Sequence, residues 1–198
     1  MEYLVFNIKN EQHFKNMESS LANMAPELTS KTNILICVED ESLYVRVRNI
    51  KDSLIVGHYG EILVSYSKDF VGEVKENISG SNGDIIFVNP NHVLKFGAYK
   101  KFMYDSLSLR YGLVACQTHN KCMKVEDLYD ELNKTEIELS DCEKKYNLYF
   151  VDDIFDATFM IKIENLRFWL GDNNLGIYLK RMGYQNYIDN DIPVKEVK

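Results

Sequence analysis

The chain has 198 residues, 45% hydrophobic and 27% charged, which is enough for one large domain or two small domains with hydrophobic cores. Its formal net charge of -7 excludes a protein that coats nucleic acid over its whole surface and leaves room for one locally basic face. The sequence contains no leader-like or membrane-spanning apolar run, and its four cysteines are scattered, so we expect a cytoplasmic protein without membrane contact.

The first half of the chain alternates strand-like and helix-like segments. Residues 2–8 have the β-branched and aromatic content of a strand, and apolar side chains recur at helical spacing over residues 10–27, with Asn10 as the expected N-cap. Leu43, Val45 and Val47 alternate with polar side chains, which predicts a strand with one solvated face. The extended segments predicted in this region are 32–40, 42–50 and 53–67.

The same order of segments recurs after the glycine-containing loop at residues 76–84. A strand over 84–89 leads into a helix over 90–102, with Asn89 as N-cap and Pro90 at the first helical position. Two further helices are predicted within 122–134 and 157–173, where "VEDLYDEL" and "IENLRFWL" share a pattern. The extended segments predicted between and after these helices are 106–112, 113–117, 135–151 and 175–188.

This order predicts an α+β fold built from repeated strand-helix-strands units, with antiparallel sheets that carry short helices on one face. We expect two domains, residues 1–118 and a shorter one at 119–198. The stretches "YLVFNIKNEQHFKNMESSLANM", "ILICVEDESLYVRVRN" and "DIIFVNPNHVLKF" follow the order of a domain of the DNA sliding clamps. The chain therefore resembles these clamps, the processivity factors that hold polymerases on their template.

The resemblance implies a non-enzymatic protein without cofactors that closes into a homo-oligomeric ring around double-stranded DNA and tethers a polymerase or another DNA enzyme. Inner helices would contact phosphates loosely and without reading bases. The residues expected to face DNA are Lys9, Lys15, His92, Lys95, Lys100, Lys101 and Arg167. A client protein would bind an apolar groove, for which the candidates are Leu43, Tyr44, Met123 and Val125.

Other functions remain open from the residues alone. Cys116, His119 and Cys122 have C-x-x-H-x-x-C spacing and Cys142 follows, so a zinc site is an alternative to reduced thiols, although no metal is our expectation. No glycine cradle for a nucleotide is present, and no catalytic motif surrounds the histidines. The alternatives to a clamp are a small acidic binding module or inhibitor that uses a sheet edge without DNA contact, and an unrecognised enzyme.

Overall fold

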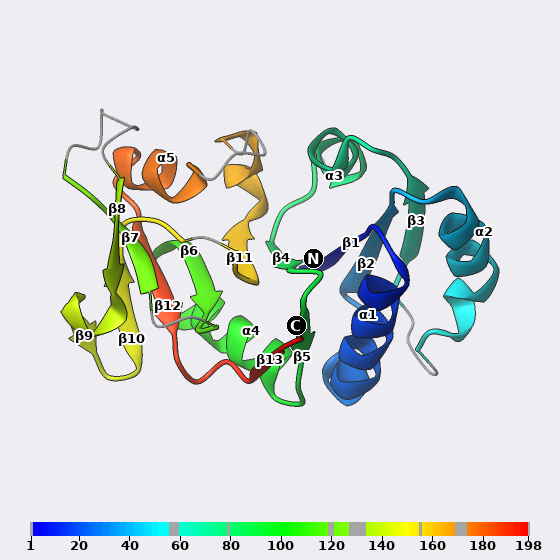
Figure 1. The fold of residues 1–198 in the computed structure, drawn as a ribbon, viewed down its shortest axis with the longest axis horizontal. Coiled ribbons are helices and arrows are strands. Elements are labelled where there is room, and N and C mark those ends of the chain that lie inside the picture. The colour runs from blue at the N-terminus through cyan, green and yellow to red at the C-terminus, as the bar shows by residue number, and fades with distance from the viewer. Residues whose placement is uncertain are drawn as a thin grey trace.

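The structure, a computed structural model, is dominated by one mixed nine-stranded β-sheet with the order β3-β2-β1-β4-β11-β6-β12-β10-β9 (Figure 1). It describes residues 2–55, 60–78, 80–118, 121–126, 134–154, 156–168 and 174–197, without the side chains of residues 167 and 168. The strands of this sheet are β1 (Glu2–Ile8), β2 (Thr32–Val38), β3 (Ile62–Tyr66), β4 (Asp84–Val88), β6 (Tyr111–Cys116), β9 (Lys144–Lys145), β10 (Leu148–Val151), β11 (Phe159–Lys162) and β12 (Gln185–Asp189).

The first part of the sheet is parallel. Strand β1 lies between β2 and β4 and pairs in parallel with both, and β3 pairs in parallel with β2 on the outer side. The chain therefore builds outward from β1 in one direction and then returns to add β4 on the opposite side of β1. This reversal of strand order is a topological switch point, and it lies between β1 and β4.

The second part of the sheet is mixed in direction. Strand β11 is antiparallel to both β4 and β6, so it lies between strands from an earlier part of the chain. Strand β12 runs parallel to β6, and β10 and β9 complete the sheet with antiparallel pairs. Strands from residues 1–118 and from 119–198 thus share hydrogen bonds, and a division of the chain into two domains at residue 118 stays a prediction. Two short sheets pair β5 (His92–Leu94) with β13 (Val194–Glu196) and β7 (Lys121–Val125) with β8 (Lys134–Glu138).

Helices cover both faces of the large sheet. One hydrophobic core contains Phe14 from α1 (Glu11–Met24), Leu43 from α2 (Glu41–Ile50) and Phe102 from α4 (Ala98–Ser108). The other core contains Val74 from α3 (Phe70–Ile78) and Leu175 from α5 (Leu175–Arg181). The 3₁₀-helices are η1 (Ala25–Glu27), η2 (Lys51–Ser53), η3 (Leu139–Asp141) and η4 (Ile163–Phe168). None of the helices in the described part of the chain has the length and apolar character needed to cross a membrane.

The mixture of helices and strands is as the sequence predicts, but the expected antiparallel sheets with helices on one face are wrong. The prediction failed first at residues 42–50, which form helix α2 rather than a strand. The Asp40 side chain accepts the Leu43 backbone N–H at 2.9 Å and caps the helix. Leu43 and Val47, one helical turn apart, are buried while Val45 is 52% exposed, so a pattern that alternates like a strand also satisfies a helix.

Other predicted boundaries moved for similar local reasons. Residues 90–102 contain β5 before α4 begins, and Gly97 enters the helix with a φ of 94° that favours glycine. The segment predicted as a helix at 157–173 starts as the central strand β11 and continues as η4. The beginning of the predicted helix at 122–134 is strand β7, and residues 127–133 lie outside the described part. The extended segment predicted at 175–188 begins as helix α5.

Candidate functional site at the carboxyl ends of β1, β2 and β4

The candidate site is the edge of the sheet where the parallel strands β1, β2 and β4 end. In open α/β sheets, ligands bind outside the carboxyl ends of the strands at a topological switch point. That point here lies between β1 and β4. The chain places polar side chains at all three strand ends, whereas each strand body is buried.

Three of these polar side chains lie on the same face of the sheet, next to the apolar core of that face. Val5, Cys37 and Phe87 belong to the core on the α3 side of β1, β2 and β4. Because side chains of a strand alternate between faces, the residue two positions later points to the same side. The residues two positions later are Asn7, Glu39 and Asn89. The apolar surface beneath α3 therefore ends in a row of two amides and one carboxylate.

Asn7 is the most buried member of this row. It is 9% exposed, and its Nδ2 donates a hydrogen bond to Glu39 Oε1 at 3.1 Å. Its Oδ1 is buried and has no hydrogen-bond partner among the described residues. A buried acceptor without a donor costs free energy, about 1–3 kcal/mol in mutational data. A donor from outside the described residues, a buried water or a ligand group, would satisfy this oxygen.

Charge at this edge comes from Lys9, which directly follows β1. Lys9 Nζ lies 3.0 Å from Glu39 Oε1, and its side chain is 51% exposed. The Lys9 backbone N–H donates to His13 Nδ1 at 3.4 Å. Burial and, next, the Lys9 charge lower the pKa of His13. Lys9 is thus the positive group of this strand end.

The end of β4 is held by a hydrogen-bonded turn. Asn89 Nδ2 donates to Asp156 Oδ1 at 2.6 Å, and the Asn89 backbone N–H donates to Thr158 Oγ1 at 3.0 Å. The Asn91 backbone N–H donates to Asn89 Oδ1 at 2.8 Å. His92 is 1% exposed, and its Nδ1 lies 3.0 Å from Thr158 Oγ1. The segment before β11 therefore fixes the position of the β4 end.

The residues of the zinc alternative are separated by the sheet. Cys122 and Cys142 lie together, with their Sγ atoms 2.9 Å apart, on the α3 side. Cys116 packs in the core on the other face, and His119 lies outside the described residues. Within the described ranges no group of three or more His, Cys, Asp or Glu side chains is placed to hold a metal ion.

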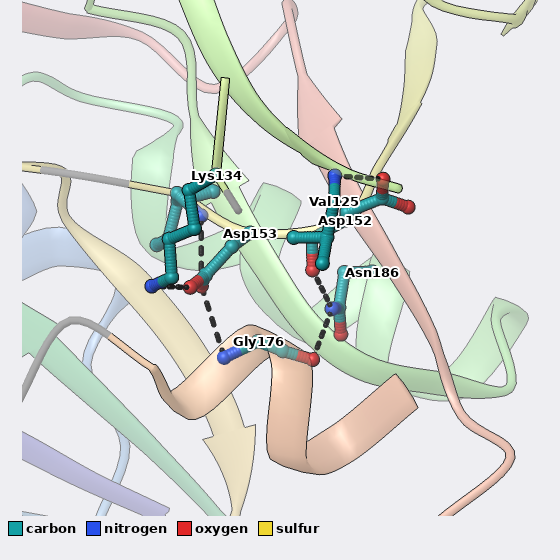
Figure 2. Close-up of polar contacts among 7 residues, drawn as sticks. Val125, Lys134, Asp152, Asp153, Gly176 and Asn186 are labelled. Atoms are coloured by element: carbon teal, nitrogen blue, oxygen red, sulfur yellow. Dashed lines mark hydrogen bonds and ion pairs between the residues drawn. The ribbon is translucent and has the colours of Figure 1, made fainter. Parts of the chain in front are cut away.

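A second buried polar cluster lies around the start of α5 (Figure 2). Asp153, 1% exposed, accepts the Gly176 backbone N–H at 3.0 Å, and its Oδ2 lies 3.1 Å from Lys134 Nζ. Burial raises the pKa of Asp153 to about 6, while the Lys134 charge opposes this rise. Asn186 Nδ2 donates to the carbonyls of Asp152 and Gly176, each at 2.8 Å. These contacts connect β12, α5 and the end of β10, so we interpret the cluster as structural.

The opposite edge of the sheet, where β1 and β4 begin, contains a cavity of about 520 Å³. Glu2, Asp84 and Tyr99 contribute to its wall, together with Leu107 of α4. Its amino-terminal position is not the end at which parallel sheets bind ligands. The switch-point edge is therefore the stronger candidate.

No protein-family model matches this chain, and no curated protein sequence matches it. The fold, however, matches a solved structure, "Crystal structure of GalNAc-T7 with UDP, GalNAc and Mn2+", with a TM-score of 0.72 and 10% sequence identity. The chain has the fold of a glycosyltransferase domain. The match covers 100% of this chain and 44% of GalNAc-T7, so the chain spans less than half the length of that protein.

The glycosyltransferase fold overturns the resemblance to DNA sliding clamps. It also removes the basis for a non-enzymatic processivity factor that encircles DNA, and the alternative of an acidic binding module gains no support. The expectation that the chain is not an enzyme is corrected as well, because the fold is shared with an enzyme domain. The error arose because strand-helix alternation was interpreted as antiparallel, whereas the register of β1 with β2 and β4 is parallel.

The residues proposed to face DNA around α1 and β5 have different surroundings. Lys9 lies at the candidate site in its ion pair with Glu39. Lys15 is exposed on α1. His92 is buried, so its ring faces the protein interior rather than a nucleic acid. Of these three residues, Lys9 and His92 lie at the carboxyl edge of the sheet.

The remaining basic candidates lie near the start of α4. Lys95 and Lys100 are exposed, and Lys100 Nζ lies 5.8 Å from the centre of the Phe96 ring. Lys101 pairs with one aspartate of α4 and one of β12. The side chain of Arg167 lies outside the described residues. The described members of the set are thus divided between the α1 and α4 regions.

The four residues proposed for client binding do not lie together. Leu43 and Tyr44 belong to α2, which packs against β3 at one end of the sheet. Met123 and Val125 belong to β7, which lies next to β10 at the other end (Figure 1). Leu43 and Val125 are also buried.

Sequence reasoning missed Asn7, Glu39 and Asp156 and interpreted Asn89 only as a helix cap. A signal for the first two was present, because polar residues follow directly on buried strands in "LVFNIKN" and "LICVED". Polar residues at the ends of parallel strands are typical of ligand sites. The signal was not used because the strands were assigned to antiparallel sheets.

Proposed function

We propose that this chain binds a uridine diphosphate sugar at the carboxyl ends of β1, β2 and β4 and belongs to a glycosyl-transferring enzyme. The proposal is supported by the glycosyltransferase fold over the full chain and by the UDP and GalNAc in the matched structure. In such a reaction the bond between the sugar anomeric carbon and the β-phosphate oxygen breaks. A bond from that carbon to the oxygen of an acceptor hydroxyl forms, the hydroxyl proton passes to solvent, and UDP leaves with the electron pair of the broken bond.

The observation that carries the proposal is the buried, unpartnered acceptor at Asn7, stated for the described residues. A nucleotide sugar offers suitable donors, namely the uracil N3–H and the hydroxyls of ribose and sugar. A site that is built to hydrogen-bond a ligand group rejects analogues that lack it, because its own polar group is then left unpaired. Asn7 would therefore contribute to selectivity as well as affinity.

The charge at the site supports a diphosphate. Lys9 is half exposed, so its ammonium is accessible from solvent while its ion pair with Glu39 keeps it near the strand end. A cation at this position would favour a bound diphosphate over neutral ligands and would stabilise the charge that develops on departing UDP.

The Mn²⁺ ion of the matched structure does not fit the described residues of this chain. Manganese prefers carboxylate, carbonyl and water ligands. The turn after β4 supplies the amides of Asn89 and Asn91, and the Asn89 oxygen already accepts the Asn91 backbone N–H. The neighbouring Asp156 carboxylate is held by the Asn89 amide. We therefore derive no step through a metal ion.

The proposal is tested by titrating the purified chain with UDP and with UDP-GalNAc in buffer that contains MnCl₂, using isothermal calorimetry. The expected result is saturable binding of both, with ADP binding more weakly because adenine presents the acceptor N1 where uracil presents the donor N3–H. UDP release from UDP-GalNAc is measured in parallel. Absence of UDP and UDP-GalNAc binding in the presence of Mn²⁺ would contradict the proposed function.

A variant connects this binding to the site. Replacing Asn7 with Val removes the free acceptor and should weaken UDP binding at least about tenfold, equal to about 1.4 kcal/mol. Asn49→Val on the exposed surface of α2 is the matched control and should leave UDP affinity unchanged. Equal affinity of both variants and the unmodified chain would place the nucleotide elsewhere.

A further inference from the structure

We infer that the diphosphate is bound without a divalent cation, with Lys9 supplying the positive charge. This inference rests on the proposed function, because it concerns how the same site holds UDP. It arises from the disagreement between the donor atoms at this edge and the ion in the matched structure.

The first step is the chemistry at the end of β4. The described side chains that follow this strand are Asn89 and Asn91, which are neutral amides. An amide oxygen is a weaker ligand for a hard cation than a carboxylate, which carries a full negative charge. Both polar atoms of the Asn89 side chain already form hydrogen bonds. Nδ2 donates to Asp156, and Oδ1 accepts the Asn91 backbone N–H.

The second step concerns the carboxylates nearby, each of which has a protein partner. Glu39 Oε1 accepts from Asn7 and pairs with Lys9. Asp156 accepts from Asn89, and Asp40 caps helix α2 through the Leu43 N–H. In the described part of the chain these carboxylates do not converge into a set that could hold a cation.

The third step is charge compensation. A diphosphate near a strand end needs positive charge, and a divalent cation and a lysine are alternative sources of it. Lys9 Nζ is held by one carboxylate and remains half exposed, so it can contact a phosphate while keeping the Glu39 contact. Burial and the Lys9 charge lower the pKa of the neighbouring His13, which makes its imidazole a weaker source of positive charge. Lys9 is therefore the described cation that we place against the phosphates.

The decisive experiment measures UDP binding by calorimetry in two buffers, one with EDTA and one with MnCl₂. The expected result is the same dissociation constant in both, within about twofold. Binding in MnCl₂ alone would overturn the inference and leave the proposed function intact. Absence of binding in both buffers would overturn the inference and the proposed function together.

Two lysine variants test whether Lys9 supplies the positive charge that compensates the diphosphate. Lys9→Gln should weaken UDP binding in EDTA at least about tenfold, because the phosphates lose their counter-charge and Glu39 loses its cation. Lys15→Gln removes the same charge from an exposed position on α1 and should change the dissociation constant by less than about twofold. Equal effects of the two variants would overturn the role of Lys9.

Two asparagine variants test whether the phosphates lie beside the end of β4. Asn91→Asp places a carboxylate after β4 and should weaken UDP binding in EDTA by charge repulsion, with partial recovery in MnCl₂ because the new carboxylate and the phosphates can share a cation. Asn49→Asp on α2 adds the same charge at a remote exposed position and should have no effect. Unchanged UDP affinity of Asn91→Asp in EDTA would overturn the placement of the phosphates beside the β4 end.

Discussion

Lys162 Nζ lies 2.8 Å from Asp84 Oδ1, and this ion pair connects the last residue of β11 to the first residue of β4. Asp84 also accepts the hydroxyls of Ser106 and Tyr111, each at 2.5 Å. One carboxylate thus holds together α4, β4, β6 and β11 at the amino-terminal end of β4. This contact joins parts of the chain that are far apart in sequence.

Removing the cation of this pair should destabilise the protein. Lys162→Met leaves Asp84, which is 8% exposed, without its charge partner, and we expect a loss of about 2 kcal/mol in the free energy of unfolding, reduced by the partial exposure of the lysine. Urea unfolding measures this value. Lys121→Met, which breaks an exposed ion pair with Glu136, is the control and should cost less than about 1 kcal/mol.

Gly176 at the start of α5 is predicted to tolerate no side chain. A Cβ atom there would lie 2.3 Å from Asp153 Oδ1 and 2.9 Å from the Asp152 backbone oxygen, so Gly176→Ala should lower the free energy of unfolding by about 1–3 kcal/mol. Gly72→Ala in α3 is the matched contrast, since its new methyl group would meet the exposed Asp69 side chain, which can rotate away. A loss for Gly72→Ala as large as that for Gly176→Ala would contradict this explanation.

The free energy of unfolding should decrease as pH rises, because Asp105 loses a proton that the folded state holds. Lys101 Nζ lies 2.8 Å from Asp105 Oδ1 and also contacts Asp189. Burial, reinforced by Asp189, raises the pKa of Asp105 from 3.8 to about 7, so between these values the folded chain binds more protons than the unfolded chain. The free energy of unfolding therefore decreases as pH rises through this window and becomes independent of this group above about 7.

Urea unfolding at several pH values between about 5 and 8 measures that slope. Asp105→Asn should reduce it. A smaller slope of the same sign should remain from Asp153, whose pKa burial raises to about 6. A slope that is unchanged in Asp105→Asn would show that Asp105 does not titrate in this range.

Cys122 and Cys142 should form a disulfide under peroxide. Their Sγ atoms lie 2.9 Å apart. Hydrogen peroxide would oxidise one thiol to a sulfenic acid with release of water, and the second thiol would displace a second water to form the disulfide. Burial raises the pKa of Cys122, so the reaction should be slow at pH 7 and faster at higher pH. Mass spectrometry of peptides detects the crosslink, and its absence at alkaline pH would contradict the expected proximity.

Asn7→Val should separate stability from binding. The variant removes a buried acceptor without a described partner and places a β-branched side chain in a strand. The ion pair between Glu39 and Lys9 remains. The free energy of unfolding should be equal to or higher than that of the unmodified chain. UDP affinity should nevertheless fall, and a variant that is both less stable and equally able to bind would show that Asn7 has a structural role.

Local patterns in the sequence were sufficient for several elements. The strands at 2–8, 32–38 and 84–88 and the helix at 11–24 were predicted close to their observed bounds, as was the Asn10 cap, whose side chain accepts the His13 N–H at 3.0 Å. These features depend on contacts within a few residues, such as apolar spacing and capping. The site did not emerge in the same way, because Asn89 and Asn91 carry no local mark of a ligand contact.

By itself the sequence determined which segments are apolar enough to form buried strands and that Asn10 caps the first helix. The predicted Asn89 cap was wrong, because strand β5 follows it and α4 begins after Gly97. The tertiary structure alone decided that β1 pairs in parallel with both β2 and β4 and that β11 lies between β4 and β6. It also decided that the ends of β1, β2 and β4 meet at one edge, where Asn7, Lys9, Glu39 and Asn89 become neighbours. The physical reason is that strand direction and order depend on hydrogen bonds between distant segments, which a local pattern of apolar residues does not encode.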